Sequence, residues 1–133
     1  CPASVDDSLP RGRCHVALLD GEVVGQYILL HTRPFTAEVV SLSVAPALQR
    51  RSIGTRLLDH AVRTARTLGF RRLEIGTGDT GFDQLRLYER CGFVRCGIDR
   101  GYFTRFYPAP VIENGLVCRD MVRLSMDLDR PVR

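Results

Sequence analysis

The sequence predicts an α/β fold in which a mixed, mostly antiparallel β-sheet carries flanking helices. Three observations support this. Asp20-Gly21 joins two apolar segments, an amphipathic helical pattern follows a third strand-like segment, and a further short apolar segment follows the helix after a very short turn. A tight turn pairs strands antiparallel, whereas a strand-helix-strand unit makes its outer strands parallel, so one sheet is expected to contain both pairings.

The N-terminal half predicts three strands. Residues 15–19 and 23–30 are apolar, and Asp20-Gly21 supplies the positive φ angles of a hairpin turn. Residues 38–44, EVVSLSV, are rich in β-branched side chains and are followed by Pro46, which ends the third strand.

The pattern from residue 52 to residue 68 predicts an amphipathic helix. The apolar positions recur at three- to four-residue steps and are Ile53, Leu57, Leu58, Ala61, Ala65 and Leu68. Gly69 follows and can take the left-handed cap. Residues 73–75 then predict a short buried strand.

The C-terminal half predicts a short helix over residues 84–91, closed by Gly92, and a strand over residues 93–98. Residues 99–118 are aromatic and contain prolines, and we expect little regular structure there. A segment of that length favours a functional use, although an aromatic cluster packed under a long loop is the alternative. Residues 119–128 predict the last strand.

Length and composition fit one globular domain. The chain has 133 residues, 44% hydrophobic and 26% charged. Residues 1–13 are polar with two prolines and indicate a leader or loop, the remnant of a truncated N-terminus, so the single domain is expected over residues 14–133.

Charge and hydropathy argue against two classes of partner. The nineteen basic residues are all arginine, they are scattered, and the net charge is only +4, so nucleic-acid binding is not favoured. No apolar run approaches the roughly 20 residues that cross a bilayer, so no membrane partner is expected. Guanidinium groups suit a phosphate-bearing small molecule.

The five cysteines are odd in number and form no C-x-x-C pair. They therefore indicate neither a disulfide framework nor a metal site, and a cytoplasmic location is expected. We expect them to be buried small hydrophobes, Cys91 in particular, because it lies inside a helical pattern.

Residues 44–58, VAPALQRRSIGTRLL, run from a strand through a proline and a glycine-containing turn into a helix. The unpaired amides of a helix's first turn and its dipole attract an anion, and a diphosphate is the obvious ligand. A plain capped helix is the alternative, with Ser52 suited to the cap.

The spacing of Gln49, Ser52 and Gly54 resembles the Q/R-x-x-G-x-G/A signature of the GNAT superfamily of N-acetyltransferases, with Ser52 in place of the first glycine. Residues 87–93, LYERCGF, are similar to the L-Y-x-x-x-G-F stretch that follows in the same family. The order of elements also agrees from residue 14 to residue 128, and small uncharacterised bacterial members are the most similar.

The resemblance implies a GNAT-like sheet with a central splayed parallel strand pair, formed by residues 38–44 and 73–78, and acetyl-CoA in the gap between them. No metal is implied. The cofactor-binding residues that it implies are Leu42, Ser43 and Val44 along pantetheine and Gln49, Arg50, Arg51, Ser52, Ile53, Gly54 and Thr55 around the pyrophosphate.

The same resemblance gives Tyr88 as the general acid that assists the departing thiolate. A core tyrosine is the alternative. Gly81 stands where the family often has an asparagine, so one cofactor contact is absent or replaced. The oxyanion is expected to meet a backbone amide around Ser43 or Val44.

For the general base we favour Glu38, acting directly or through water, with a merely solvated glutamate as the alternative. His15 and His31 titrate in a useful range but lie in an apolar run and at a strand end.

These features predict an N-acetyltransferase that moves the acetyl group from acetyl-CoA to a primary amine by direct attack on the thioester. The acceptor is a small-molecule amine or a peptide amine, residues 99–118 are candidates for the wall of its pocket, and a homodimer is possible. An acetyl-CoA-binding sensor or interaction module without turnover is the alternative, favoured by Ser52 and Gly81.

Overall fold

The computed structural model describes residues 12–46 and 52–129, and the chain divides into two compact units. The first unit comprises Cys1–Leu73 and Asp127–Arg133, and the second comprises Glu74–Met126. Within the described ranges, no helix has the length and apolar character needed to cross a membrane.

The first unit contains an antiparallel sheet of β1 (Gly12–Leu19), β2 (Glu22–Arg33) and β3 (Thr36–Val44). Asp20 and Gly21 have φ angles of 51° and 83°, the left-handed values that a two-residue hairpin turn requires. The predicted hairpin is therefore confirmed, and β1 begins slightly earlier than the predicted end of the leader.

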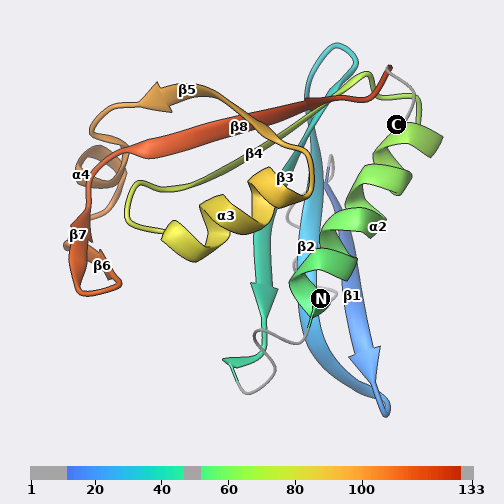
Figure 1. Cartoon of the computed structure of the whole chain (residues 1–133), viewed down its shortest axis with the longest axis horizontal. Helices are drawn as coiled ribbons and strands as arrows, with labels where there is room; N and C mark the ends of the chain where they lie inside the picture. The colour runs from blue at the N-terminus through green and yellow to red at the C-terminus, as the bar shows by residue number, and fades with distance from the viewer. Residues whose placement is uncertain (1–11, 47–51, 130–133) are drawn as a thin grey trace. The chain divides into compact units, whose positions relative to one another are not determined.

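The helix α2 (Ile53–Thr67) packs on β2 and β3 through one apolar face (Figure 1). The buried residues of this face are Leu57, Leu58, Ala61, Val62 and Ala65. At its C-terminal end Gly69 has a φ of 88°, and the Phe70 amide donates to the Ala65 carbonyl at 3.0 Å. This bond pattern is the Schellman cap, so the predicted helix end is confirmed.

The second unit contains α3 (Phe82–Arg90), β5 (Val94–Asp99) and β8 (Met121–Asp127), with β5 and β8 paired antiparallel. β4 (Arg72–Gly78) begins in the first unit and continues in the second. Gly92 closes α3 as predicted, because its φ is 104° and the Phe93 amide donates to the Tyr88 carbonyl at 3.0 Å.

The expectation of little regular structure over residues 99–118 is wrong. This segment contains the short helix α4 (Tyr102–Phe106) and a hairpin of β6 (Val111–Glu113) and β7 (Leu116–Cys118). The hairpin turns at Asn114-Gly115, where φ is 55° and 75°. Asn-Gly is the strongest two-residue hairpin signal, so the sequence carried the information.

The expectation that Cys91 is buried is also wrong, because it is the C-cap of α3 and is only half-buried. Cys118 is buried and Cys96 is exposed. These three residues carry free thiols.

Candidate active site

The C-terminal end of β3 contains a β-bulge. Gln26 of β2 pairs with Ser43, whereas Ile28 pairs with Val40, so two residues of β3 stand opposite one residue of β2. Ser41, inside the bulge, has a φ of 55°. A bulge bends its strand and increases the local twist, a feature common beside binding sites. The predicted pantetheine-binding residues begin inside this bulge, at Leu42, and continue to Val44.

The start of α2 depends on the unusual backbone of Ser52. Its φ and ψ are 65° and 6°, in the left-handed region, and its carbonyl accepts the Arg56 amide at 3.0 Å. Glycine adopts this conformation freely, whereas other residues meet a steric cost. Ser52 therefore holds a backbone conformation that a glycine would adopt without steric cost. Ser52 is the N-cap residue of α2, but within the described residues its side chain makes no capping hydrogen bond, which is what the alternative of a plain capped helix required.

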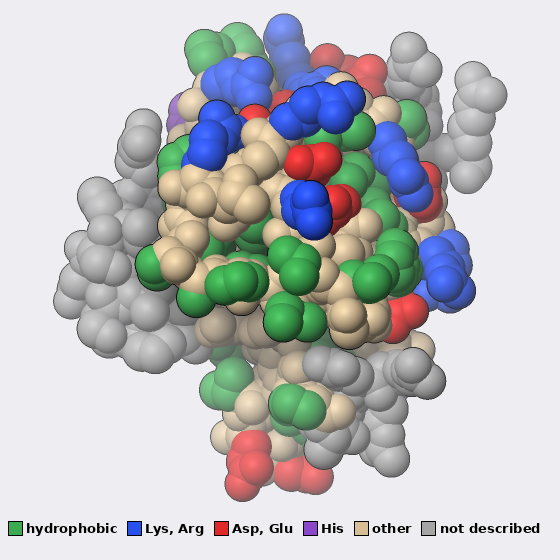
Figure 2. All heavy atoms as spheres, turned by 90° about the vertical axis from the view of Figure 1, so that its left-hand side faces the viewer, with side chains coloured by type: hydrophobic (Ala, Val, Ile, Leu, Met, Phe, Trp, Pro, Cys, Tyr) green, Lys and Arg blue, Asp and Glu red, His purple; other side chains and the backbone are tan. Residues whose placement is uncertain are grey.

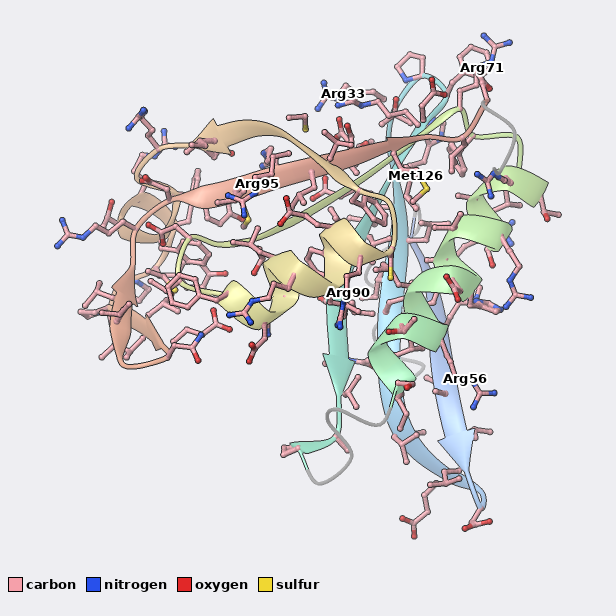
Figure 3. The ribbon with its side chains drawn as sticks, in the orientation of Figure 1. Arg33, Arg56, Arg71, Arg90, Arg95 and Met126 are labelled. Atoms are coloured by element: carbon pink, nitrogen blue, oxygen red, sulfur yellow. The ribbon has the colours of Figure 1, made fainter. Side chains whose placement is uncertain are left out.

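The amides of Ile53, Gly54 and Thr55 open α2 and have no acceptor within the helix, because the first intrahelical bond begins at Arg56. No acidic residue lies in the first turn. Arg56 is exposed and extends from the helix near its start (Figure 3). The positive end of the helix dipole is therefore not compensated by a carboxylate of this turn, and it can bind an anion.

Gly25 of β2 brings the two predicted binding segments together. A Cβ atom at this position would lie 2.8 Å from Leu57 Cδ1, 3.1 Å from the Ser43 carbonyl oxygen and 3.4 Å from Ile53 Cγ2. The first turns of α2 thus pack on β2 next to Ser43, with no room for a side chain between them. Sequence reasoning missed Gly25, since a glycine inside a strand pattern only hints at a close backbone approach.

Three of the predicted pyrophosphate residues, Gln49, Arg50 and Arg51, lie outside the described residues. Glu38 is half-buried on β3 and pairs with Leu30 of β2. Leu42 lies four residue steps further along the strand, a distance of roughly 13 Å along the chain.

Tyr88 lies on α3 in the second unit and is 4% exposed. Burial, and secondly the negative charge of Glu113, raise the pKa of Tyr88 to about 12. Its hydroxyl forms no hydrogen bond with any residue of the described ranges. A tyrosine of this kind keeps its proton at neutral pH and can donate a hydrogen bond to a ligand.

Gly81 is the N-terminal cap of α3, and its surroundings leave little room for a side chain. A Cβ atom on Gly81 would lie 2.6 Å from Thr77 Oγ1 and 3.2 Å from both Gln84 Oε1 and Glu113 Oε1. An asparagine would therefore require these side chains to move.

The two histidines that we considered as bases lie in the first unit. His15 stacks on Tyr27 with ring centroids 4.8 Å apart, and its pKa is lowered by burial and then by the charges of His60 and Arg13. His31 meets Phe70 edge to face at 5.2 Å. Among the described residues, no group of three or more His, Cys, Asp and Glu side chains could hold a metal ion.

Comparison with protein families shows that the model of the acetyltransferase (GNAT) family matches residues 2–93. Among curated proteins, the chain is 45% identical over 124 residues to a Bacillus subtilis protein named uncharacterized N-acetyltransferase YvbK, covering 93% of this chain and 80% of that protein.

Two solved structures are similar over nearly the whole chain. A Bacillus subtilis acetyltransferase in complex with CoA has a TM-score of 0.87 and 43% identity, covering 94% of this chain and 83% of the other. A GNAT family acetyltransferase from Elizabethkingia anophelis with acetyl-CoA bound has a TM-score of 0.87 and 32% identity, covering 95% and 83%. The expected fold is confirmed: a mostly antiparallel mixed sheet with the parallel pair β3 and β4 and flanking helices.

Proposed function

Because the chain belongs to the acetyltransferase (GNAT) family, we propose that it transfers the acetyl group of acetyl-CoA to a primary amine. The enzyme class and the cosubstrate expected from the sequence are confirmed by this membership and by relatives that hold CoA or acetyl-CoA. The acceptor, a small-molecule amine or a peptide amine, is part of the proposal.

The packing of the α2 start against β2 is the observation that carries the proposal. The amides of residues 53–55 stand unpaired within the helix, without an acid in the turn, and Gly25 holds them close to Ser43. We propose that the diphosphate binds these amides, with Ser52 shaping the turn and residues 49–51 completing the loop. Pantetheine then lies along residues 42–44, whose backbone groups pair with it as with a further strand.

Tyr88 is proposed as the hydrogen-bond donor to the sulfur of the leaving thiolate. Its pKa of about 12 lies well above the roughly 8.5 of an ordinary thiol. A full proton transfer to such a thiolate is therefore uphill by several kcal/mol, at 1.36 kcal/mol per unit. Tyr88 thus stabilises the developing negative charge through a hydrogen bond while it keeps its own proton.

Glu38 is proposed as the general base. An alkyl amine has a pKa of about 10.4, so only about one molecule in a thousand is neutral and nucleophilic at neutral pH. Glu38 takes the surplus proton, directly or through water, and the neutral amine attacks the thioester carbon. The amide of Ser43 or Val44 stabilises the resulting oxyanion, and no covalent enzyme intermediate is needed. Collapse of the tetrahedral intermediate breaks the C–S bond and releases the CoA thiolate, and the second proton of the amine passes to water to leave the amide.

A thiol-release assay tests this function. The chain is mixed with acetyl-CoA and a panel of alkyl, aryl-alkyl and peptide amines, and the free CoA thiol is followed together with the mass of the amine product. Release of one thiol per acetylated amine supports the proposal. Calorimetric binding of acetyl-CoA without thiol release from any amine would identify the alternative, a sensor module without turnover.

A further inference from the structure

Glu113, at the end of β6, is a half-buried carboxylate that has no cation partner. Its Oε1 atom accepts a long hydrogen bond of 3.9 Å from Cys118 Sγ, and no described residue forms an ion pair with it. Cys118 Sγ lies 2.6 Å from Thr80 Oγ1, and both residues are buried. A carboxylate in such surroundings is stabilised strongly when a cation reaches it.

The hairpin that carries Glu113 is fixed to the segment before α3. The Asn114 side-chain amide at the hairpin turn donates to the Thr80 carbonyl at 2.8 Å. Just after β7, the Arg119 amide donates to Asp79 Oδ1 at 3.0 Å. These hydrogen bonds, one at the hairpin turn and one just after β7, fix the backbone of the hairpin and therefore the position of Glu113.

Glu113 also lies near Tyr88, the proposed donor to the thiolate. Its charge is the second cause of the raised pKa of Tyr88, so the two groups act on each other electrostatically. The small Gly81 leaves the carboxylate room, since a Cβ there would lie 3.2 Å from Glu113 Oε1. Tyr88, the proposed hydrogen-bond donor, and Glu113, which forms no ion pair with a described residue, are therefore neighbours within the second unit.

Phe103 of α4 lies close to Cys118, the residue that donates to Glu113. A Cβ atom on Gly78 would lie 3.0 Å from Cys118 Sγ and 3.4 Å from the Phe103 ring, so Phe103 and the thiol border the same glycine. Phe103 stacks on Tyr107 with centroids 5.5 Å apart and meets Tyr102 edge to face at 5.2 Å.

The aromatic side chains continue into an exposed apolar surface. Figure 2 shows hydrophobic side chains gathered on the side of the molecule that carries α4 and the β6–β7 hairpin. Its large exposed members are Phe106, Tyr107, Ile112, Leu116 and Val117. A patch of this kind beside the Glu113 carboxylate complements a molecule that is cationic at one end and apolar at the other.

We propose that Glu113 binds the ammonium group of the acceptor while the aromatic side chains of α4 contact its apolar part. The acceptor class is then a primary amine on an aryl-alkyl or long alkyl group, captured in the ammonium form that predominates at neutral pH. Aromatic faces add attraction for the cation, and an acidic acceptor would be repelled by the carboxylate. This inference rests on the proposed acetyltransferase function.

The test is calorimetric titration of the protein saturated with CoA, with 2-phenylethylamine as the probe and 2-phenylethanol as its uncharged counterpart. The wild type is expected to bind the amine at least tenfold more tightly than the alcohol. Glu113→Gln, which keeps the shape of the side chain, should weaken amine binding tenfold to a hundredfold and leave binding of the alcohol unchanged. Glu22→Gln, an exposed glutamate of the first unit, is the matched control and should bind as the wild type does.

Equal amine affinity in the wild type and Glu113→Gln would overturn the inference, as would equal affinity of the wild type for the amine and the alcohol. The thiol-release assay separates this failure from failure of the proposed function. If the wild type acetylates amines and Glu113→Gln has an unchanged KM for them, only the inference fails. If amines bind through Glu113 but no thiol is ever released, the proposed function fails and the binding site stands.

Discussion

Gly25 and Leu57 meet where α2 crosses β2, and a methyl group on residue 25 would come within 2.8 Å of Leu57 Cδ1. This contact fixes how closely the first turns of α2 approach the end of β3. The proposed diphosphate contacts are the backbone amides of residues 53–55. The position of these amides therefore depends on how α2 packs on β2.

Replacing Gly25 with alanine should therefore weaken acetyl-CoA binding. The added methyl group forces Leu57 and the start of α2 away from β2, at a cost of about 1–3 kcal/mol in the free energy of unfolding. We expect a roughly tenfold rise in the Kd for acetyl-CoA, a change of about 1.4 kcal/mol, measured by calorimetry. Gly97→Ala is the control, because no atom of the described part of the chain lies within 4 Å of the added Cβ, and it should bind normally. Normal binding by Gly25→Ala would contradict the proposed position of the diphosphate.

Ser52→Gly should stabilise the fold without loss of acetyl-CoA affinity. The left-handed conformation costs a residue with a side chain about 1–2 kcal/mol. Glycine removes this cost. It also gives the unfolded chain more conformational entropy, which lowers the free energy of unfolding by about 0.4–1 kcal/mol. Urea denaturation should show a net gain of up to about 1.6 kcal/mol in the free energy of unfolding. A clear loss of stability would mean that the serine side chain has a structural role that its hydrogen bonds do not show.

Tyr88→Phe should lower kcat about tenfold to a hundredfold while the Kd for acetyl-CoA changes less than twofold, since the hydroxyl serves the developing charge on sulfur. Steady-state kinetics and calorimetry on the same variant check this. A parallel loss of turnover and affinity, together with a lower melting temperature, would instead support a packing role for this tyrosine.

The pH profile of kcat offers a separate test of Tyr88. With a pKa of about 12, the folded tyrosine stays protonated, so its ionisation should remove no activity between pH 7 and pH 10. The pH profiles of kcat should therefore have the same shape for the wild type and Tyr88→Phe in this range, with lower kcat values for the variant. A fall of wild-type activity near pH 9 that is absent from Tyr88→Phe would contradict the assignment.

His15 should make the fold less stable as the pH falls. Its Nε2 atom is buried and has no hydrogen-bond partner within residues 12–46 and 52–129, and burial lowers its pKa below the ordinary value of 6.5. As the pH falls below 6.5 the unfolded chain takes up a proton that the folded chain resists, so the stability present above that pH is progressively lost. His15→Phe keeps the ring against Tyr27 and removes the titration. Urea denaturation at pH 7.5 and 5.5 should show a smaller loss of stability in the variant, and equal losses would refute this role.

Local signals in the sequence predicted much of the fold. Asp20-Gly21 gave the first hairpin, and Gly69 and Gly92 gave the ends of two helices, because each of these devices is contained in a few consecutive residues. Asn114-Gly115 is a signal of the same kind that we overlooked amid prolines and aromatic residues, so the β6–β7 hairpin was missed.

The candidate site was less accessible from sequence. The close approach at Gly25 involves residues of β2, β3 and α2, and the thiol of Cys118 meets Thr80 across 38 positions of the chain. No periodicity encodes such contacts, since they arise only when separate elements pack. Glu113 was not predicted for the same reason. In the sequence, a glutamate before an Asn-Gly turn indicates a solvated residue, and its contact with Cys118 forms only in the folded chain.

The most direct test of the central claim is a crystal structure of the chain with acetyl-CoA. We predict diphosphate oxygens about 2.7–3.2 Å from the amide nitrogens of residues 53–55, and pantetheine alongside residues 42–44. A complex in which the nucleotide binds elsewhere, with these amides turned to solvent, would contradict the account.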